Sequence, residues 1–352
     1  MRILGIETSC DETAAAIVED GQRLLSNVVA SSMELHVEYG GVVPEIAARN
    51  QIEVIIPVIQ QTLSDANCNW KDIDGIAVTY GPGLGGSLLI GVLTARTLAI
   101  TQNVPLYTIN HVEAHVYASF ITETSLPGLF LRHKQPDFPM LAIIVSGGHT
   151  QLVLFQDHFD YKLLGQTQDD AIGEAFDKVA KILGLPYPGG PSVAVAATHG
   201  NPSAFQLPKA KMDKYDFSFS GLKTAVLRLA QAQIGEDYGF PSIKLPERLS
   251  VAQKHDIAAS FQRIAIETIV DKAKLAFYEF APNSIVIAGG VAANEELRRQ
   301  LTEAIPIVIE FPDQQLCTDN GAMVATLGCF KAIFNQPQAD PFVLDIEPSL
   351  SM

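Results

Sequence analysis

Two histidines one helical turn apart carry the clearest chemical signal in this chain. His111 and His115 enclose the segment His-Val-Glu-Ala-His. On a helix, side chains at positions i and i+4 lie one above the other, which suits two ligands of one metal ion. Such a pair by itself is more often structural. It is also not His-Glu-x-x-His, because Glu113 comes two residues after the first histidine, so the general base of a metalloprotease is misplaced.

A metal site at these histidines needs a third ligand. Asp319 is a candidate because it opens the last predicted helix, about 319–334, where a strand–helix junction can present a side chain. Two imidazoles and one carboxylate with open positions suit Fe(II) or Zn(II). Spacing alone does not show that Asp319 reaches the histidines.

Three glycine turns follow apolar strands, at residues 81–86, 147–148 and 289–290. Backbone N–H groups in such turns, with the start of a following helix, can bind phosphate. A single turn of this kind often only connects two secondary-structure elements, but three in a repeated pattern predict a nucleotide held between two lobes. No Gly-x-x-x-x-Gly-Lys-Ser/Thr is present, which argues against a P-loop ATPase.

Acidic residues flank the first hairpin turn and open a later helix. Asp11 and Glu12 could orient water, a metal or a nucleophile, or could simply be solvated turn residues. Glu7 lies within the preceding strand, where a carboxylate is costly without a partner. Asp177 lies too deep in its helix for capping, so a ligand hydroxyl is one explanation for it.

The elements that must position these residues form a pattern that occurs twice. Apolar hairpins at 3–18 and 140–155 are each followed, further along the chain, by a strand, a glycine turn and a helix. This repeat predicts two related α/β halves facing one cleft.

The predicted domains follow from this repeat. They are a first lobe of residues 1–110 plus about 320–345, a second lobe of residues 111–319 with a helical insertion at about 192–250, and a loose, Pro-rich tail at 337–352.

Bulk composition limits the class of protein. Of the 352 residues, 47% are hydrophobic, which is enough to form a sizeable buried core. The formal net charge is −15, so the chain as a whole lacks the excess of basic residues that is typical of nucleic-acid-binding proteins. Any RNA contact must use a partner or a local cluster, which is either a binding patch or an ordinary solvated surface. That cluster comprises Lys209, Lys211, Lys214, Lys223 and Arg228. Four scattered cysteines favour a reducing cytoplasmic compartment, and no apolar stretch is long enough to span a bilayer.

Taken together, nine motifs in order make the sequence resemble the bacterial tRNA N6-adenosine threonylcarbamoyltransferase family, TsaD. The motifs occupy residues 7–13, 81–83, 111–115, 146–150, 173–178, 187–191, 217–223, 289–294 and 317–322.

The resemblance implies a fold, a site and partners. The fold would be two actin-like, Hsp70-like and sugar-kinase-like (RNase H-like) lobes. The metal ligands would be His111, His115 and Asp319, holding Fe²⁺ with Zn²⁺ as an alternative. The substrate-binding residues would be Val145, Ser146, Gly147, Gly148, His149, Asp177, Gly190 and Asn294.

The implied reaction transfers a threonylcarbamoyl group from threonylcarbamoyl-AMP to N6 of adenosine 37 in tRNAs that read ANN codons. The implied partners are tRNA, the non-catalytic paralogue TsaB and the small ATPase TsaE, with a homo- or heterodimer and no membrane. We add the hypothesis that Asp11 or Glu12 lies near the incoming amine as a catalytic acid or base, because both follow the first predicted strand.

Two positions depart from the family pattern. Ala194 stands where the family often has an acidic residue, which puts a ribose contact in doubt, and Gln51 stands where it commonly has a histidine. Three alternative functions are a metalloprotease, a sugar kinase or ATPase on the same fold, and a non-enzymatic scaffold. A scaffold would be expected to lose the metal triad, and here the triad is complete.

Overall fold

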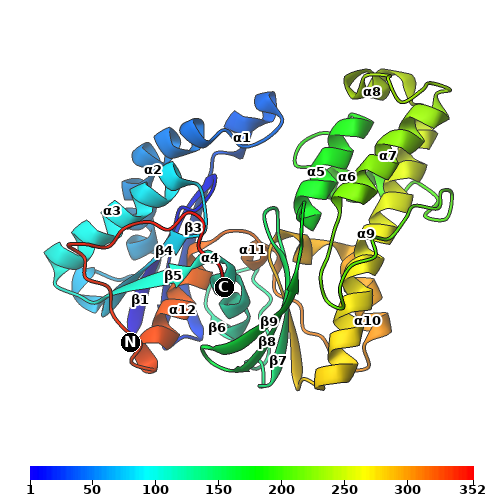
Figure 1. Cartoon of the computed structure of the whole chain (residues 1–352). Helices are drawn as coiled ribbons and strands as arrows, with labels where there is room; N and C mark the ends of the chain where they lie inside the picture. The colour runs from blue at the N-terminus through cyan, green and yellow to red at the C-terminus, as the bar shows by residue number, and fades with distance from the viewer. The chain divides into compact units, whose positions relative to one another are not determined.

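The computed structural model describes all residues, 1–352, and divides them into two compact units. Unit 1 comprises residues 1–136 and 312–352, and unit 2 comprises residues 137–311 (Figure 1). The sequence placed the boundaries at 110/111 and 319/320 instead. The difference arises because the histidine helix that begins at His111 packs on the helix that begins at Gly321. None of the helices combines the length and apolar character that crossing a membrane requires.

Unit 1 is built on a mixed six-stranded sheet with the order β5-β4-β1-β2-β3-β6. The strands are β1 Arg2–Glu7, β2 Glu12–Glu19, β3 Arg23–Ser31, β4 Gly75–Gly81, β5 Leu106–Asn110 and β6 Glu123–Thr124. β1 pairs antiparallel with β2 and parallel with β4. Both faces of β1 are covered, which is why its sequence is almost continuously apolar.

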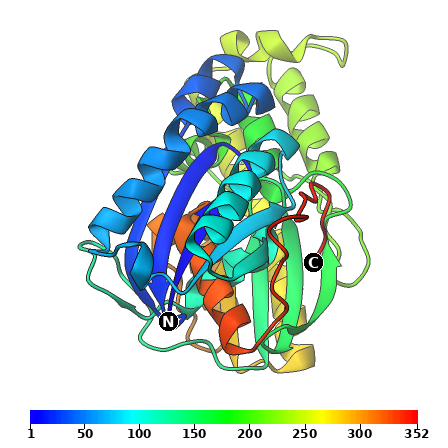
Figure 2. The same ribbon diagram turned by 90° about the vertical axis from the view of Figure 1, so that its left-hand side faces the viewer.

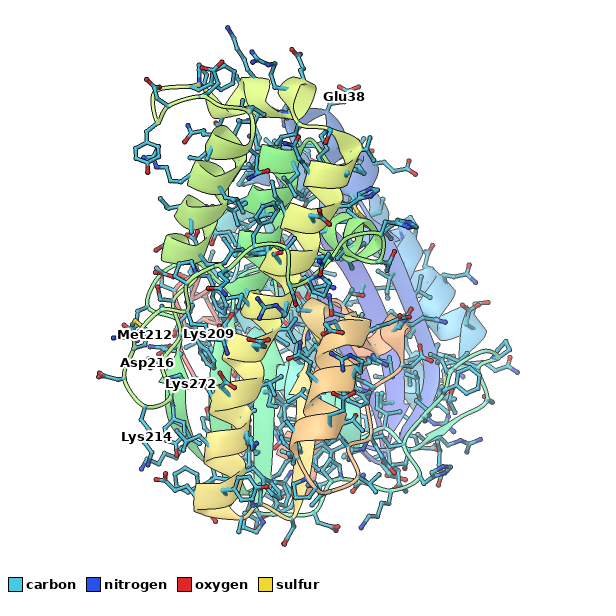
Figure 3. The ribbon with its side chains drawn as sticks, turned by 90° about the vertical axis from the view of Figure 1, so that its right-hand side faces the viewer. Glu38, Lys209, Met212, Lys214, Asp216 and Lys272 are labelled. Carbon is cyan, nitrogen blue, oxygen red and sulfur yellow. The ribbon has the colours of Figure 1, made fainter.

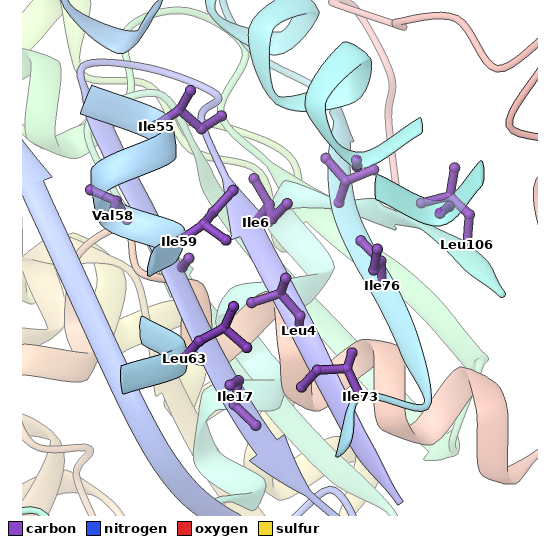
Figure 4. Packing of buried hydrophobic residues seen from close by; sticks show 14 of the residues in the cluster. Leu4, Ile6, Ile17, Ile55, Val58, Ile59, Leu63, Ile73, Ile76 and Leu106 are labelled. Carbon is purple, nitrogen blue, oxygen red and sulfur yellow. The ribbon is translucent and has the colours of Figure 1, made fainter. Parts of the chain in front are cut away.

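Helices cover the two faces of this sheet. The helices are α1 Met33–His36, α2 Pro44–Asp65, α3 Gly85–Gln102, α4 His111–Tyr117, α11 Gln314–Cys317 and α12 Gly321–Ile333, with short 3-10 turns at Val37–Tyr39, Trp70–Asp72 and Ala118–Phe120. Leu4 and Ile6 of β1 pack with Ile55 and Ile59 of α2 in a buried apolar cluster (Figure 4).

The opposite face of β1 lies directly against α12. A Cβ atom on Gly5 would be 2.3 Å from the backbone nitrogen of Ala325, so only glycine permits this approach. Helix α12 is thereby fixed against the sheet of unit 1, and with it Asp319, which lies two residues before the first residue of the helix.

Unit 2 contains a four-stranded sheet with the order β10-β7-β8-β9. The strands are β7 Met140–Val145, β8 Thr150–Asp157, β9 Asp160–Gln166 and β10 Ser284–Ala288. The helices are α5 Ile172–Leu183, α6 Gly189–Ala197, α7 Ser220–Gln233, α8 Leu245–Arg248, α9 Val251–Phe280 and α10 Glu295–Ala304, with 3-10 turns at Ser242–Lys244 and Gly290–Ala293. The stretch predicted as a helical insertion contains most of α6 together with α7 and α8.

The sheets confirm the predicted fold class. Each contains an antiparallel hairpin, β1–β2 or β7–β8, and a strand parallel to the first strand of that hairpin. Strands β3, β5, β6 and β9 were not predicted from the sequence. β3 and β9 are only partly buried, so they lack the continuous apolar run that marked the others.

The tail after residue 337 differs from the loose segment that its proline content predicted. It has no regular secondary structure, yet its backbone is bonded to unit 1 at several points, beginning with Ala339 N–H donating to the Leu106 carbonyl at 2.8 Å. Proline removes backbone donors but leaves carbonyl acceptors, and the carbonyls of Pro341 and Pro348 both accept hydrogen bonds from the rest of unit 1.

Candidate active site

Helix α4 positions both histidines. It begins immediately after β5, where the Asn110 side chain caps it by accepting hydrogen bonds from Val112 N (2.9 Å) and Glu113 N (3.3 Å). His111 and His115 are both buried, 7% and 3% exposed. A short helix of seven residues depends on such a cap and on tertiary packing for its stability.

The third predicted ligand lies beside them. Asp319 Oδ1 is 3.2 Å from Nε2 of His115 and 3.7 Å from Nε2 of His111, and donor atoms of the three residues all lie within 4.8 Å of one another. Asp319 is placed by the start of α12, which Asn320 caps by accepting from Met323 N at 3.1 Å.

The donor set fits a metal ion. Ligands about 2.1 Å from one ion lie roughly 3 to 3.4 Å apart in tetrahedral or octahedral coordination, close to the separations seen here. His115 is buried, and neither of its ring nitrogens makes a hydrogen bond. Its Nε2 approaches the Asp319 carboxylate without hydrogen-bond geometry, as expected of two groups that share a cation rather than a proton.

A second layer of polar groups orients the His111 ring. Ser9 Oγ lies 3.1 Å and Glu7 Oε2 lies 3.4 Å from Nδ1 of His111, which leaves Nε2 directed at Asp319. Glu7 also accepts from Ser9 N at 2.6 Å and from the Thr79 hydroxyl. The carboxylate that needed a partner in the β1 strand therefore has three. Its position beside Nδ1 of His111 is the one that outer partners of zinc-bound histidines take.

Buried charge shifts the pKa values of this region. Burial lowers the pKa of His111, but the carboxylates of Asp319 and Glu7 outweigh it and raise the pKa to about 9. Burial raises the pKa of Glu113 to about 7, opposed by the ammonium group of Lys331. A bound cation competes with protons for such ligands.

The turn between β1 and β2 carries the two proposed catalytic acids. Burial raises the pKa of Glu12 to about 10, and the neighbouring Asp319 and Asp11 carboxylates add to that shift. The carboxyl group of Glu12 therefore holds its proton more tightly than a solvated glutamate does. Both side chains are only partly buried, so a ligand can reach them.

Sequence reasoning missed how this turn is held. Gln51 is fully buried, and its Nε2 donates toward the carbonyls of Cys10 (3.0 Å), Glu12 (3.1 Å) and Thr8 (3.4 Å). The departure from the family histidine thus places an amide donor under the turn. A glutamine with helical spacing on α2 gives no sequence signal for this role.

The first glycine turn is not a free phosphate cradle. Gly83 N donates to the Pro348 carbonyl at 3.2 Å, and Leu84 N donates to the Ser9 carbonyl at 2.7 Å. A Cβ on Gly81 would lie 2.0 Å from the Glu347 carbonyl oxygen. The prediction of a phosphate site at residues 81–86 is wrong at this part of the turn, because other segments of the same chain occupy it.

The glycine turn of unit 2 is open. A Cβ on Gly147, Gly148 or Gly190 would meet no atom within 4 Å, which leaves the room that a ligand needs for close approach. Ser146 and His149 close the turn: Ser146 N donates to the His149 carbonyl at 2.8 Å, and His149 N donates to Ser146 Oγ at 3.1 Å.

The start of α5 and the start of the 3-10 turn after β10 both lie against that turn. Gly173 N donates to the Ser146 carbonyl at 3.2 Å. Gly289 has φ +90°, and a Cβ there would lie 2.6 Å from the Val145 carbonyl oxygen. Val145, at the end of β7, is thus in contact with the third predicted glycine turn.

Asp177 and Asn294 already hold protein groups. Asp177 Oδ1 accepts from Gly189 N at 2.7 Å, while burial raises the pKa of its carboxyl group. Asn294 caps α10 through Leu297 N (3.1 Å) and donates to Gln262 Oε1 (3.1 Å). Their predicted contacts with substrate stay predictions.

The predicted basic cluster is largely neutralised. Lys209 pairs with Asp271 (2.7 Å) and Glu267 (3.1 Å), and Lys214 pairs with Glu279. Figure 3 shows these lysines beside Met212, Asp216 and Lys272 on and near the loop that faces α9. Lys223 is likewise paired, with Asp170 at 3.3 Å. An open hollow here is lined by Gln168, Lys211, Met212, Asp213 and Asp216.

The fold and the site together define a class: a two-unit α/β protein with a His–His–Asp cluster that could hold a metal ion. A solved structure of full-length HypF in the phosphate- and nucleotide-bound form matches 95% of this chain and 46% of that one, with a TM-score of 0.58 and 13% identity. That likeness concerns the fold alone.

Sequence relatives define the family. The family description "TsaD: tRNA N6-adenosine threonylcarbamoyltransferase" matches residues 23–326. Proteins named tRNA N6-adenosine threonylcarbamoyltransferase from Thermomicrobium roseum (49% identity, 92% of this chain, 90% of that one) and Gloeothece citriformis (45%, 99% and 96%) are similar to it. The chain belongs to the tRNA N6-adenosine threonylcarbamoyltransferase family, which confirms the predicted family and the predicted enzyme class, a tRNA-modifying transferase.

Proposed function

We propose that this protein transfers the threonylcarbamoyl group from threonylcarbamoyl-AMP to N6 of adenosine 37 in tRNAs that read ANN codons. The observation that supports this most directly is the buried cluster of His111, His115 and Asp319 in a chain of this family. A peptide-cleaving enzyme would need a base beside the first histidine, and the second residue of α4 is Val112.

We propose Fe²⁺ as the resident ion, with Zn²⁺ as an alternative for the same ligands. When bound, the ion would act as a Lewis acid and an anchor for an oxygen of the adenylate. Ser9 and Glu7 would keep the His111 ring in its ligating orientation, since both contact Nδ1.

The chemistry asks the protein mainly to hold two partners. N6 of the adenine attacks the carbamoyl carbon, a C–N bond forms, the C–O bond to the phosphate breaks, and AMP leaves with both electrons while N6 loses a proton. A mixed anhydride is already activated, so positioning and charge stabilisation account for most of the catalysis. We propose that whichever of Asp11 and Glu12 is ionised in the loaded protein accepts that proton.

In unit 2, we propose that Val145, Ser146, Gly147, Gly148, His149, Asp177, Gly190 and Asn294 bind the adenylate. The open space in front of Gly147, Gly148 and Gly190 supports this, because a phosphate or ribose can approach backbone N–H groups there.

We propose tRNA, the paralogue TsaB and the small ATPase TsaE as partners, in a homo- or heterodimeric assembly within the cytoplasm. The net charge of −15 and the paired lysines of unit 2 support a partner that contributes to tRNA capture.

The test is reconstitution with threonine, bicarbonate, ATP, tRNA and the partner proteins, reading out modified adenosine by nucleoside mass spectrometry. A second arm supplies preformed threonylcarbamoyl-AMP, which separates transfer from synthesis of the donor. Formation of threonylcarbamoyladenosine in both arms supports the proposal. Peptide cleavage, or ATP turnover without tRNA, in place of it would favour the metalloprotease or kinase alternatives.

The proposed acids are tested in the same second arm. Glu12→Ala and Asp11→Ala are compared with Glu123→Ala, an exposed acid on β6. If the transfer rate of either variant is undiminished, that residue has no part in the mechanism.

A further inference from the structure

Residues 339–352 form an ordered strap along unit 1. Figure 2 shows it as the red segment that runs upward from the end of α12, and Figure 1 shows it crossing α3 and ending beside α4. Arg96 of α3 clamps its first part by donating to three of its carbonyls: Pro341 (2.6 Å), Phe342 (2.8 Å) and Leu344 (3.0 Å).

The second part of the strap closes on the first glycine turn. Glu347 N donates to the Tyr80 carbonyl at 2.7 Å, and Gly83 N donates to the Pro348 carbonyl at 3.2 Å. Gly81 lacks the Cβ that would strike Glu347. The turn and the strap are thus shaped to each other, and each donates one backbone N–H to the other.

The end of the strap reaches the cap of the histidine helix. Asn110 Nδ2 donates to the Ser351 carbonyl at 3.2 Å, while Asn110 Oδ1 accepts from Val112 N and Glu113 N. A carbonyl can only accept, so Ser351 fixes which end of the Asn110 amide faces the helix. The contact therefore holds the cap in its capping orientation.

A second chain of contacts leads from the strap to the same histidine. The Gly83–Leu84 turn that the strap braces donates from Leu84 N to the Ser9 carbonyl at 2.7 Å. A Cβ on Gly83 would lie 2.5 Å from that same oxygen, so the two segments are in close contact. The Ser9 hydroxyl then lies 3.1 Å from Nδ1 of His111.

We propose that the strap is a positioning element of the metal centre, and that Arg96 and Asn110 are the residues through which it acts. Both routes end at His111, one at the start of its helix and one at its ring. Outer contacts of this kind set how well a ligand is oriented, and their loss commonly weakens metal affinity about tenfold to a hundredfold. The inference rests on the proposed metal site.

The test measures metal affinity directly rather than activity. Full-length protein is stripped of metal and titrated with Zn²⁺ against a chromophoric chelator, and with Co²⁺, whose visible absorption reports the geometry of its ligands. Three variants are compared with the unmodified chain. Arg96→Met removes the clamp and keeps the apolar stem, and Asn110→Ser keeps a capping oxygen but cannot reach Ser351. Arg299→Met on α10 of unit 2 is the matched control.

The expected result is a dissociation constant for Zn²⁺ raised about tenfold in Arg96→Met and Asn110→Ser, a changed Co²⁺ spectrum, and an unchanged control. Affinities within twofold of the unmodified chain in both variants would overturn the inference. A chain that binds neither ion before any substitution would overturn the proposed metal site instead. Should Arg96→Met fail to fold, the result for Asn110→Ser decides alone, because its helix cap is retained.

Discussion

At the scale of single residues, the two histidines of the proposed metal site differ in which of their ring nitrogens have hydrogen-bond partners. His111 has its Nδ1 engaged by Ser9 and Glu7, whereas His115 has no hydrogen bond at either ring nitrogen. A buried imidazole without a partner is costly unless something else binds it. The two rings therefore differ in how they are held, although the sequence spaces them as equivalents.

The first prediction concerns these ligands. His115→Ala and Asp319→Ala should each lose bound metal, because two remaining donors do not complete a site. The measurement is metal content of purified protein by mass spectrometry. His199→Ala, an exposed histidine after α6, is the control and should retain full content. Full metal content in His115→Ala would remove that residue from the ligand set.

Two glycines of unit 2 differ in what surrounds them: Gly173 is packed against the protein backbone, whereas Gly147 faces open space. Gly173→Ala should destabilise the protein by about 1–3 kcal/mol. Its Cβ would lie 2.6 Å from the Ser146 carbonyl oxygen, and relieving that clash requires the backbone to shift. Gly147→Ala should leave the free energy of unfolding nearly unchanged, since its Cβ meets no atom within 4 Å.

The second prediction is that Gly147→Ala raises KM for threonylcarbamoyl-AMP while its denaturant midpoint stays that of the unmodified chain. Urea unfolding and steady-state transfer kinetics provide the two measurements. An unaltered KM would contradict a close approach of substrate to this turn.

At the scale of elements, one carboxylate joins two helices of unit 2. Asp169, which lies just before α5, accepts from Phe219 N (2.8 Å), Ser220 N (3.2 Å) and the Ser218 and Ser220 hydroxyls at the start of α7. Burial opposes ionisation, but these hydrogen bonds outweigh it and lower the pKa of Asp169.

The third prediction follows from that shift. Because the folded-state pKa lies below the unfolded value of 3.8, Asp169 contributes its stability above pH 3.8, and this is lost as pH falls through the lower folded pKa. Asp169→Ala should therefore lower the melting temperature at pH 7 by an amount that corresponds to about 1 kcal/mol, and the difference should vanish toward pH 2. Calorimetry at both pH values checks it. A difference that persists at pH 2 would show that the effect is not that of the charge.

At the scale of the whole molecule, the net charge and its distribution bear on the proposed capture of tRNA. The chain carries a net charge of −15, and three lysines of the predicted patch, Lys209, Lys214 and Lys223, are paired with carboxylates of α9 or with Asp170. A lysine already in an ion pair gains less from a phosphate, because its existing partner must be displaced.

The fourth prediction is that replacing Lys209, Lys214 and Lys223 together by glutamine leaves the salt dependence of tRNA binding nearly unchanged. Three phosphate contacts would contribute a slope of roughly −2 to −3 in log K against log salt. Filter binding across a salt series, with and without the partner proteins, gives the slope. If the triple variant loses that much of the salt-dependence slope, the three lysines do contact RNA and the prediction is contradicted.

The sequence by itself determined the fold class, the hairpins of both units and the identity of the family. Continuous apolar runs and motifs consist of residues that are close together in the chain, so both can be recognised without a structure. The sequence also named His111, His115 and Asp319, but the third of these rested on resemblance more than on spacing, since Asp319 lies 204 positions after His115 (319 − 115) and no periodicity spans such a gap.

Only the tertiary structure decided that these three donors converge, that Glu7 and Ser9 hold one ring, and that Gln51 supports the turn of the proposed acids. The tertiary structure also shows that the Pro-rich tail forms an ordered strap, and that the strap packs on the glycine turn at 81–86, which was predicted to bind phosphate. The physical reason is the same in each case. A hydrogen bond between segments far apart in sequence depends on where the sheet places them, and the residue types at its two ends do not encode that meeting.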